Sequence, residues 1–144
     1  MGHLTSVKTI GAGVGLTLTY FLGGWDTMLQ VLVGLMILDY ITGMGASAVL
    51  GRWSSKTGFI GILKKAFILV IVAIGHGLDQ ILPMPEPWIR TALVLFYVVN
   101  ECLSILENAA ELKIPVPAWI LKLLAATQED TENAGNGRIT GPGR

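Results

Sequence analysis

The stretch FIGILKKAFILVIVAIGHGLDQIL, from Phe59 to Leu82, decides the fold. A helix crosses the hydrocarbon core of a bilayer with about 20 mostly apolar residues. This stretch meets that length, so it predicts a membrane-spanning helix. Residues 25–50 and 88–110 are also long and apolar enough, and they predict two further spans.

The composition of the whole chain agrees with a lipid environment. Of the 144 residues, 52% are hydrophobic and only 14% are charged, and the mean hydropathy is +0.63. Soluble domains have about 25% charged residues. So few charges do not cover the surface of a water-soluble fold of this size. We therefore expect an integral membrane protein whose main partner is the lipid bilayer.

A fourth apolar stretch, residues 5–24, is harder to interpret. Three glycines, Gly11, Gly13 and Gly15, lower its helix propensity, and Lys8 lies near its start. The stretch is just long enough to cross the membrane, which we favour. Alternatively, it lies in the membrane interface or lines a partner helix. We therefore expect an all-α membrane bundle of three to four transmembrane helices.

The connections between the stretches are short and predict antiparallel neighbours. Gly23 and Gly24 separate the first two, residues 51–58 the next two, and the proline-rich residues 83–87 the last two. Three tryptophans fall at the predicted ends of spans, where the headgroup region favours them: Trp25, Trp53 and Trp88.

Lysine and arginine predict the orientation of the bundle. Arg52 and Lys56 lie in the connection 51–58, whereas the connection 83–87 contains Glu86. The positive-inside rule therefore places residues 51–58 and the C-terminus in the cytoplasm, and residues 83–87 outside. The N-terminus is cytoplasmic if the first stretch crosses, and outside if it does not.

The C-terminal part of the chain divides into two segments. Residues 116–126 are too short to cross a membrane, and Trp119 and Ile120 share a helix face with Leu123 and Leu124. We expect an amphipathic helix on the inner membrane surface. Residues 127–144 are polar and glycine-rich, and we expect them to be disordered. Residues 1–126 then form the membrane domain.

Ionisable residues within the spans are the strongest functional signal. Asp39 and Glu101 lie near the middles of the second and fourth stretches, and Lys64 and Lys65 lie in the third. A charge at such depth costs about 2.5–3.5 kcal/mol on insertion scales. Counting residues puts the two carboxylates at similar depths, with a lysine in reach. Either these charges pair and specify packing, or they line an aqueous or oligomeric surface, which we favour.

Further polar residues continue this pattern along the fourth stretch. At about 100° per residue, the following lie within an arc of about 120°: Asn100, Glu101, Ser104, Glu107, Asn108 and Glu111. Small residues that permit close approach of helices occur at Gly43 and Ser47 in the second stretch, and at Gly58 and Gly61 at the start of the third. These positions predict helix packing, and they weakly favour oligomers.

The sequence contains no motif that predicts catalysis. It lacks a P-loop, an HExxH, a CxxC pair and a GxSxG, and its two histidines, His3 and His76, are far apart. We therefore expect no enzyme activity, no metal site and no cofactor. The formal net charge of zero argues against nucleic-acid binding through a broad basic field.

Several segments, in order over about residues 20–125, resemble the phage lysis and toxin-secretion holins. That group includes holins of phages of Gram-positive bacteria and the clostridial toxin-locus holin. The matching segments are Gly23-Gly-Trp-Asp26, Asp39-Tyr-Ile-Thr-Gly43, Ser55-Lys-Thr-Gly-Phe-Ile-Gly-Ile-Leu-Lys-Lys65, Asn100-Glu-Cys-Leu-Ser-Ile-Leu-Glu-Asn108 and Pro115-Val-Pro117. Each is weak alone, and together they are fairly specific.

The resemblance implies a function that hydropathy does not show. Holins accumulate in the bacterial cytoplasmic membrane, form homo-oligomers and open lesions through which an endolysin or a toxin passes. The polar residues of the spans then pair in the resting bundle and pair again, or face water, in the open oligomer. Two alternatives remain open: a small ion channel or transporter subunit, and a membrane adaptor that permeabilises nothing.

Overall fold

The computed structural model describes residues 2–82, 85–120, 122 and 126, and these residues contain no strand. Four helices follow one another along the chain: α1 (Gly2–Phe21), α2 (Thr27–Val49), α3 (Ser55–Ile81) and α4 (Trp88–Glu111). A short C-terminal helix begins at residue 118. The predicted all-α class is confirmed. The predicted tail, residues 127–144, lies outside the described residues, as does part of segment 116–126.

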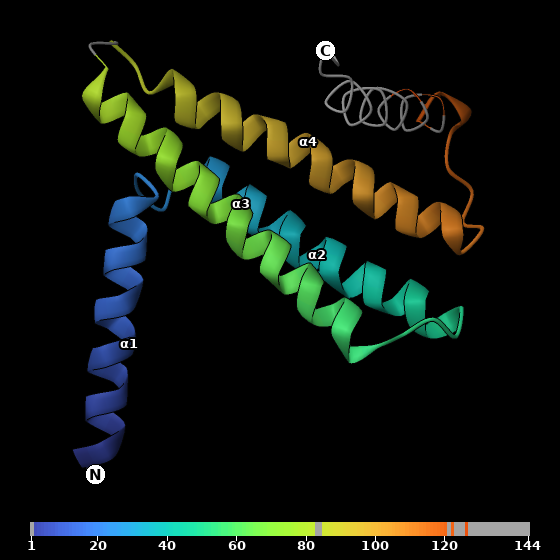
Figure 1. Ribbon diagram of the computed structural model, residues 1–144, viewed down its shortest axis with the longest axis horizontal. Helices are drawn as coiled ribbons and strands as arrows, with labels where there is room; N and C mark the ends of the chain where they lie inside the picture. The colour runs from blue at the N-terminus through green and yellow to red at the C-terminus, as the bar shows by residue number, and fades with distance from the viewer. Residues whose placement is uncertain (1, 83–84, 121, 123–125, 127–144) are drawn as a thin grey trace, which may run out of the picture.

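Three of these helices, α2, α3 and α4, are long and apolar enough to cross a membrane. Helices that follow each other in the chain run antiparallel, so α2 and α4 run parallel, and Figure 1 shows the three helices side by side. The helix α1 is not among the three, although the sequence favoured a crossing for residues 5–24. It contacts α3 but neither α2 nor α4, and it projects away from the other helices (Figure 1).

Local sequence explains where the helices begin. Asp26 caps α2 by accepting a hydrogen bond from the backbone N–H of Leu29, and Ser54 caps α3 in the same way at Thr57. The serine cap starts α3 at Ser55, about one turn before the predicted start at Phe59. Glycines with positive φ form the turns before these caps: Gly23, Gly24 and Gly51.

Packing within the bundle is centred on α4. It lies against both α2 and α3, which approach each other much less closely. The most deeply buried apolar side chains are Leu29 and Leu32 of α2, Val72 of α3 and Val94 of α4, each 0% exposed. These residues lie in the half of the bundle nearer the connection between α3 and α4. This half therefore has an apolar core.

The outer surface of the bundle is strongly apolar. Large hydrophobic side chains more than half exposed occur on every spanning helix, and include Ile37, Ile41, Phe67, Ile74, Phe96 and Val99. A water-soluble protein rarely exposes so much contiguous apolar surface. The surface is that of a bundle surrounded by lipid, in which close packing and polar contacts hold the helices together.

Candidate functional site

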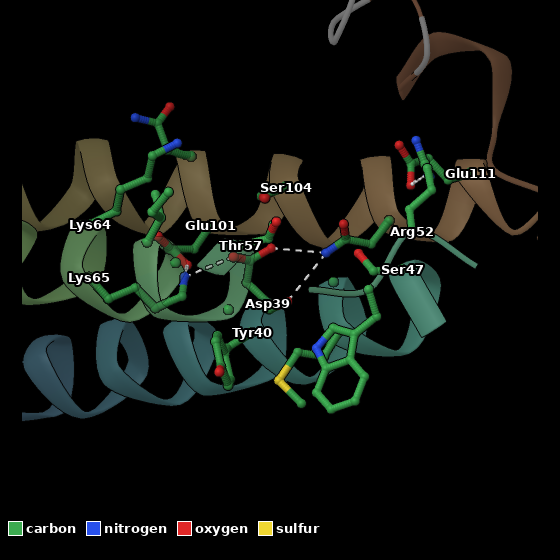
Figure 2. Close-up of a pocket in the computed structure, with 18 of the residues that line it drawn as sticks. Asp39, Tyr40, Ser47, Arg52, Thr57, Lys64, Lys65, Glu101, Ser104 and Glu111 are labelled. Carbon is green, nitrogen blue, oxygen red and sulfur yellow. Dashed lines mark hydrogen bonds and ion pairs between the residues drawn. The ribbon is translucent and has the colours of Figure 1, made fainter. Parts of the chain in front are cut away.

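A cluster of three charged side chains joins the spanning helices. Figure 2 shows Lys65 of α3 pointing between Asp39 of α2 and Glu101 of α4. The Lys65 Nζ lies 2.8 Å from Asp39 Oδ2 and 2.5 Å from Glu101 Oε2. The side chains of Lys65 and Asp39 are 16% exposed, and that of Glu101 is 7% exposed. Two carboxylates on different helices thus share one ammonium group. We call these three residues the charged triad.

Asn108 extends the charged triad along α4. Its Nδ2 donates hydrogen bonds to Asp39 Oδ1 and to Thr42 Oγ1, both at 3.0 Å. The Thr42 hydroxyl in turn donates to the backbone oxygen of Asp39 at 3.1 Å. A Cβ added at Gly43 would lie 3.4 Å from Asn108 Nδ2, so a larger side chain there would crowd the amide. Asp39 is therefore held by contacts from α3 and from α4.

The charged triad lies in a groove of about 660 Å³ in the half of the bundle nearer the connection between α2 and α3. Apart from the charged triad, its polar lining includes Ser47, Lys64, Asn100, Ser104, Asn108 and Glu111. At the mouth of the groove, Arg52 forms an exposed ion pair with Glu111 at 2.8 Å. The polar residues of α4 thus face α2 and α3 instead of lipid.

Two glycines of α3 make room for an aromatic ring beside the charged triad. A Cβ added at Gly58 would lie 3.3 Å from the Tyr40 hydroxyl oxygen, and one at Gly61 would lie 3.5 Å from the Tyr40 ring. Both glycines were selected from the sequence as helix-packing positions. Their contact explains how α3 passes Tyr40 of α2, although α2 and α3 pack little against each other elsewhere.

The structure does not bring all of the sequence-selected residues into the charged triad. Lys64 lines the groove and forms no ion pair with a described residue. Ser104 and Asn100 also line it, whereas Glu107 is not among the lining residues. Sequence spacing allowed either lysine to pair, and the structure assigns that role to Lys65.

A second polar cluster lies at the other end of the bundle, and the sequence did not predict it as a site. Arg90 of α4 is only 4% exposed. It donates to the backbone oxygen of Leu22 at 2.6 Å and of Gly24 at 3.4 Å, and forms an ion pair with Asp26 at 2.7 Å. Arg90 therefore ties the turn between α1 and α2 to the start of α4. We call this group the turn cluster.

Two further interactions stabilise the turn cluster, one made by Asp79 and one made by Asp26. Asp79 accepts hydrogen bonds from the backbone N–H groups of Ile89 and Arg90, so it satisfies the free donors at the start of α4. The hydrogen bond from Arg90 holds the pKa of Asp26 below its usual 3.8, although burial opposes this shift. The side chains of Asp26 and Arg90 are thus charged partners at neutral pH.

The chemistry of both clusters is that of ion pairing. Among the described residues, no group of three or more His, Cys, Asp or Glu side chains is placed to hold a metal ion. The same residues include no buried side-chain nitrogen or oxygen atom that lacks a hydrogen-bond partner. The buried polar side chains of the spans are thus satisfied as long as α2, α3 and α4 stay together.

Comparison with known proteins identifies the family. The chain is 37% identical over 128 residues to an uncharacterised protein of Halalkalibacterium halodurans, covering 86% of this chain and 95% of the relative. An uncharacterised protein of Listeria monocytogenes is 42% identical, with 83% and 88% covered. A probable holin of Bacillus phage phi105 is 30% identical over 112 residues, with 78% and 82% covered. No solved structure matches significantly.

The family-level comparison covers most of the membrane bundle. The sequence model of the bacteriophage holin family matches residues 16–129. That range includes α2, α3 and α4 in full, and with them every residue of the charged triad and of the turn cluster. The chain therefore belongs to the bacteriophage holin family.

Proposed function

We propose that this protein is a holin that oligomerises in the cytoplasmic membrane of a bacterium and forms lesions. An endolysin, or a toxin, would then cross the membrane, and the host cell would lyse. Family membership and the relative described as a probable holin support a role of this type. Lesion formation, homo-oligomers and the endolysin as functional partner are parts of the proposal.

The charged triad is the observation that carries this proposal. The ammonium of Lys65 meets the carboxylates of Asp39 and Glu101 within the membrane-spanning helices. Each of the three groups comes from a different helix. Their charges sum to one negative charge when all three are ionised. Such a group is stable in a membrane only while its partners stay together or while water replaces them.

The arrangement of the helices makes an exchange of partners possible. The helices α2 and α3 pack little against each other, so α4 and the charged triad hold them together. If α4 moved away, Glu101, Asn108 and Ser104 would present a polar face. In an oligomer, this face can line a water-filled lesion, or pair with a neighbouring subunit. We propose that the closed bundle is the resting state.

The proposed orientation follows the positive-inside rule. Arg52 and Lys56 lie at the end of the bundle where α2 and α3 connect, and we propose that this end and the C-terminus face the cytoplasm. The groove of the charged triad then opens toward the cytoplasm. Attachment of a reporter enzyme that is active on one side of the membrane only, after residue 144, tests this orientation.

Controlled expression in a bacterium tests the function. We expect a delay after induction, then abrupt entry of a membrane-impermeant dye, and lysis only when a cytoplasmic endolysin is present. Steady growth with an intact membrane would contradict the proposal and favour an adaptor. Graded, ion-selective conductance without cell death would favour a channel or transporter subunit.

A further inference from the structure

Two lysines of α3 have no side-chain partner among the residues that the structure describes. Neither the Lys56 nor the Lys64 side chain forms an ion pair or a hydrogen bond with a described residue. Two other basic residues at this end of the spans do form ion pairs. Lys65 is bound by two carboxylates, and Arg52 pairs with Glu111. The positive charges of Lys56 and Lys64 are therefore not neutralised by an ion pair with any side chain that the structure describes.

The position of Lys64 makes this charge costly. It lies nine residues after Ser55, the first residue of α3, which is about 13 Å along the helix axis. Its side chain is exposed at the edge of the groove, which Ile60 also lines, and Leu63 and Phe67 beside it are exposed outside the groove. A lysine at such depth extends its side chain toward the headgroup region, where phosphates and water are found.

The direction of the helix favours this extension. Side chains of an α-helix tilt toward its N-terminus. The N-terminus of α3 lies at the connection between α2 and α3, so the Lys64 side chain tilts toward Lys56. The two lysines are eight residues apart, and Ile60 and Leu63 lie between them on the same face. The long Lys64 side chain therefore extends over Ile60 toward the headgroup level at which Lys56 lies, where one anion can interact with both charges.

The surface around the two lysines is shaped for a lipid molecule. At about 100° per residue, five residues of α3 lie within an arc of about 100°: Lys56, Ile60, Leu63, Lys64 and Phe67. Ile60, Leu63 and Phe67 are 41%, 46% and 59% exposed. The face thus has two cations at the headgroup side and an apolar strip that continues into the span. This order of charge and apolar surface complements an anionic phospholipid.

We propose that the face of α3 formed by Lys56, Ile60, Leu63, Lys64 and Phe67 binds an anionic phospholipid. The phosphate would lie between the two lysine ammonium groups, and an acyl chain would lie along Leu63 and Phe67. Basic sites between or beside membrane helices bind such headgroups through charge. The inference is independent of lesion formation, because it concerns the resting bundle and its lipid.

Lys64 could instead interact with the carboxylates of the charged triad, but the geometry disfavours this pairing. The two carboxylates of the triad exceed its single ammonium by one charge, and Lys64 lines the same groove. Figure 2, however, draws no interaction from Lys64, and shows its side chain directed away from the triad. Each triad carboxylate is instead bound by Lys65, at 2.8 Å for Asp39 and 2.5 Å for Glu101.

Native mass spectrometry of the full chain in detergent tests the proposal. The protein is mixed with equal amounts of phosphatidylglycerol and phosphatidylcholine that have the same acyl chains. We expect wild type to retain phosphatidylglycerol preferentially. Lys64→Gln should retain about fivefold less of it, the effect of one lysine charge near an anionic lipid. Lys8→Gln removes the same charge from α1 and should retain as much as wild type.

Several results would overturn the proposal. One is equal retention of the two lipids by wild type, and another is a Lys8→Gln loss as large as that of Lys64→Gln. If Lys64→Gln unfolds more easily but keeps the lipid preference of wild type, Lys64 balances the charged triad instead. An excess of inorganic phosphate should not displace the lipid. Complete displacement would mean that the site binds free phosphate without an acyl chain.

Discussion

At the scale of single residues, Lys65 is the side chain on which the spans depend most. Among the described residues, its ammonium is the one group that forms ion pairs with both carboxylates of the charged triad. A buried ion pair adds little net stability compared with apolar packing, but removal of one partner is costly because the other charge stays behind. Lys65 therefore specifies which helices associate, in addition to stabilising them.

Replacement of Lys65 should destabilise the bundle strongly. Lys65→Gln leaves Asp39 and the nearly buried Glu101 without their cation. We expect the free energy of unfolding in detergent micelles to fall by about 3 kcal/mol, the low end of the cost of breaking a buried pair. Arg52→Gln is the matched control. Its ion pair with Glu111 is 59% and 47% exposed, so about 0–1 kcal/mol is expected. An equal loss for the two variants would contradict the role of Lys65.

The charge of Asp26 should make stability depend on acid pH. Because Arg90 lowers the pKa of Asp26 below 3.8 in the folded chain, the ionised carboxylate stabilises the fold at higher pH. This contribution is lost as the pH falls through the folded pKa. Asp26→Asn keeps a good helix cap but removes the charge. We expect wild type to be the more stable at neutral pH, and the difference to shrink on acidification. A difference that grows with acid would contradict the pairing.

At the scale of elements, the turn between α1 and α2 fixes where α1 leaves the bundle. Gly23 has φ +80° and lies between His76 and Arg90. A Cβ there would lie 2.6 Å from His76 Nδ1 and 2.8 Å from Arg90 Nε. Gly24 has φ +105° but open space around it. Gly23 is thus required for two reasons, its positive φ and the close approach of Arg90. Gly24 is required for its positive φ alone.

Alanine substitutions should separate these two reasons. Gly24→Ala introduces backbone strain alone, which costs on the order of 1–3 kcal/mol. Gly23→Ala introduces the same strain and also displaces Arg90, so its loss in free energy of unfolding should be larger. Gly13→Ala in α1 meets nothing within 4 Å, and should be neutral or stabilising. Equal losses for Gly23→Ala and Gly24→Ala would show that Arg90 is not held by the turn.

The sequence predicts the elements better than it predicts their contacts. The apolar run 59–82 is long enough to predict a membrane-spanning helix without knowledge of its contacts. The structure has α3 (Ser55–Ile81) at this place. The charged triad could be anticipated, because a count of residues already placed Asp39 and Glu101 at similar depths. Which of Lys64 and Lys65 pairs with the carboxylates could not be anticipated, because that depends on how α3 is rotated about its axis relative to α4.

The turn cluster could not be predicted, for a different reason. Arg90 lies near a helix end, where a cation is ordinary, and two of its partners are the backbone oxygens of Leu22 and Gly24. A backbone oxygen carries no signal in the sequence. A hint existed in Asp26, which directly follows Gly23-Gly-Trp at the start of a helix, as capping residues do.

At the scale of the whole molecule, the bundle has two unlike halves. The half near the connection between α3 and α4 is closed by an apolar core that includes Leu29, Val72 and Val94. The other half contains the groove and the charged triad. We propose that this combination of a closed apolar half and a polar half is the resting state. The proposed opening would separate α4 from the other two helices, because α4 packs against both whereas α2 and α3 pack little against each other.

The central claim is that the charged triad controls the opening of the membrane. The most direct test is the time from induction to dye entry in cells that express the double variant Asp39→Asn, Glu101→Gln, with wild type and Glu86→Gln as references. Glu86→Gln replaces a carboxylate by an amide in a connection outside the spans. At equal protein levels, we predict earlier dye entry for the double variant, because the resting pairing is lost, and wild-type timing for Glu86→Gln. Wild-type timing in the double variant would contradict the claim.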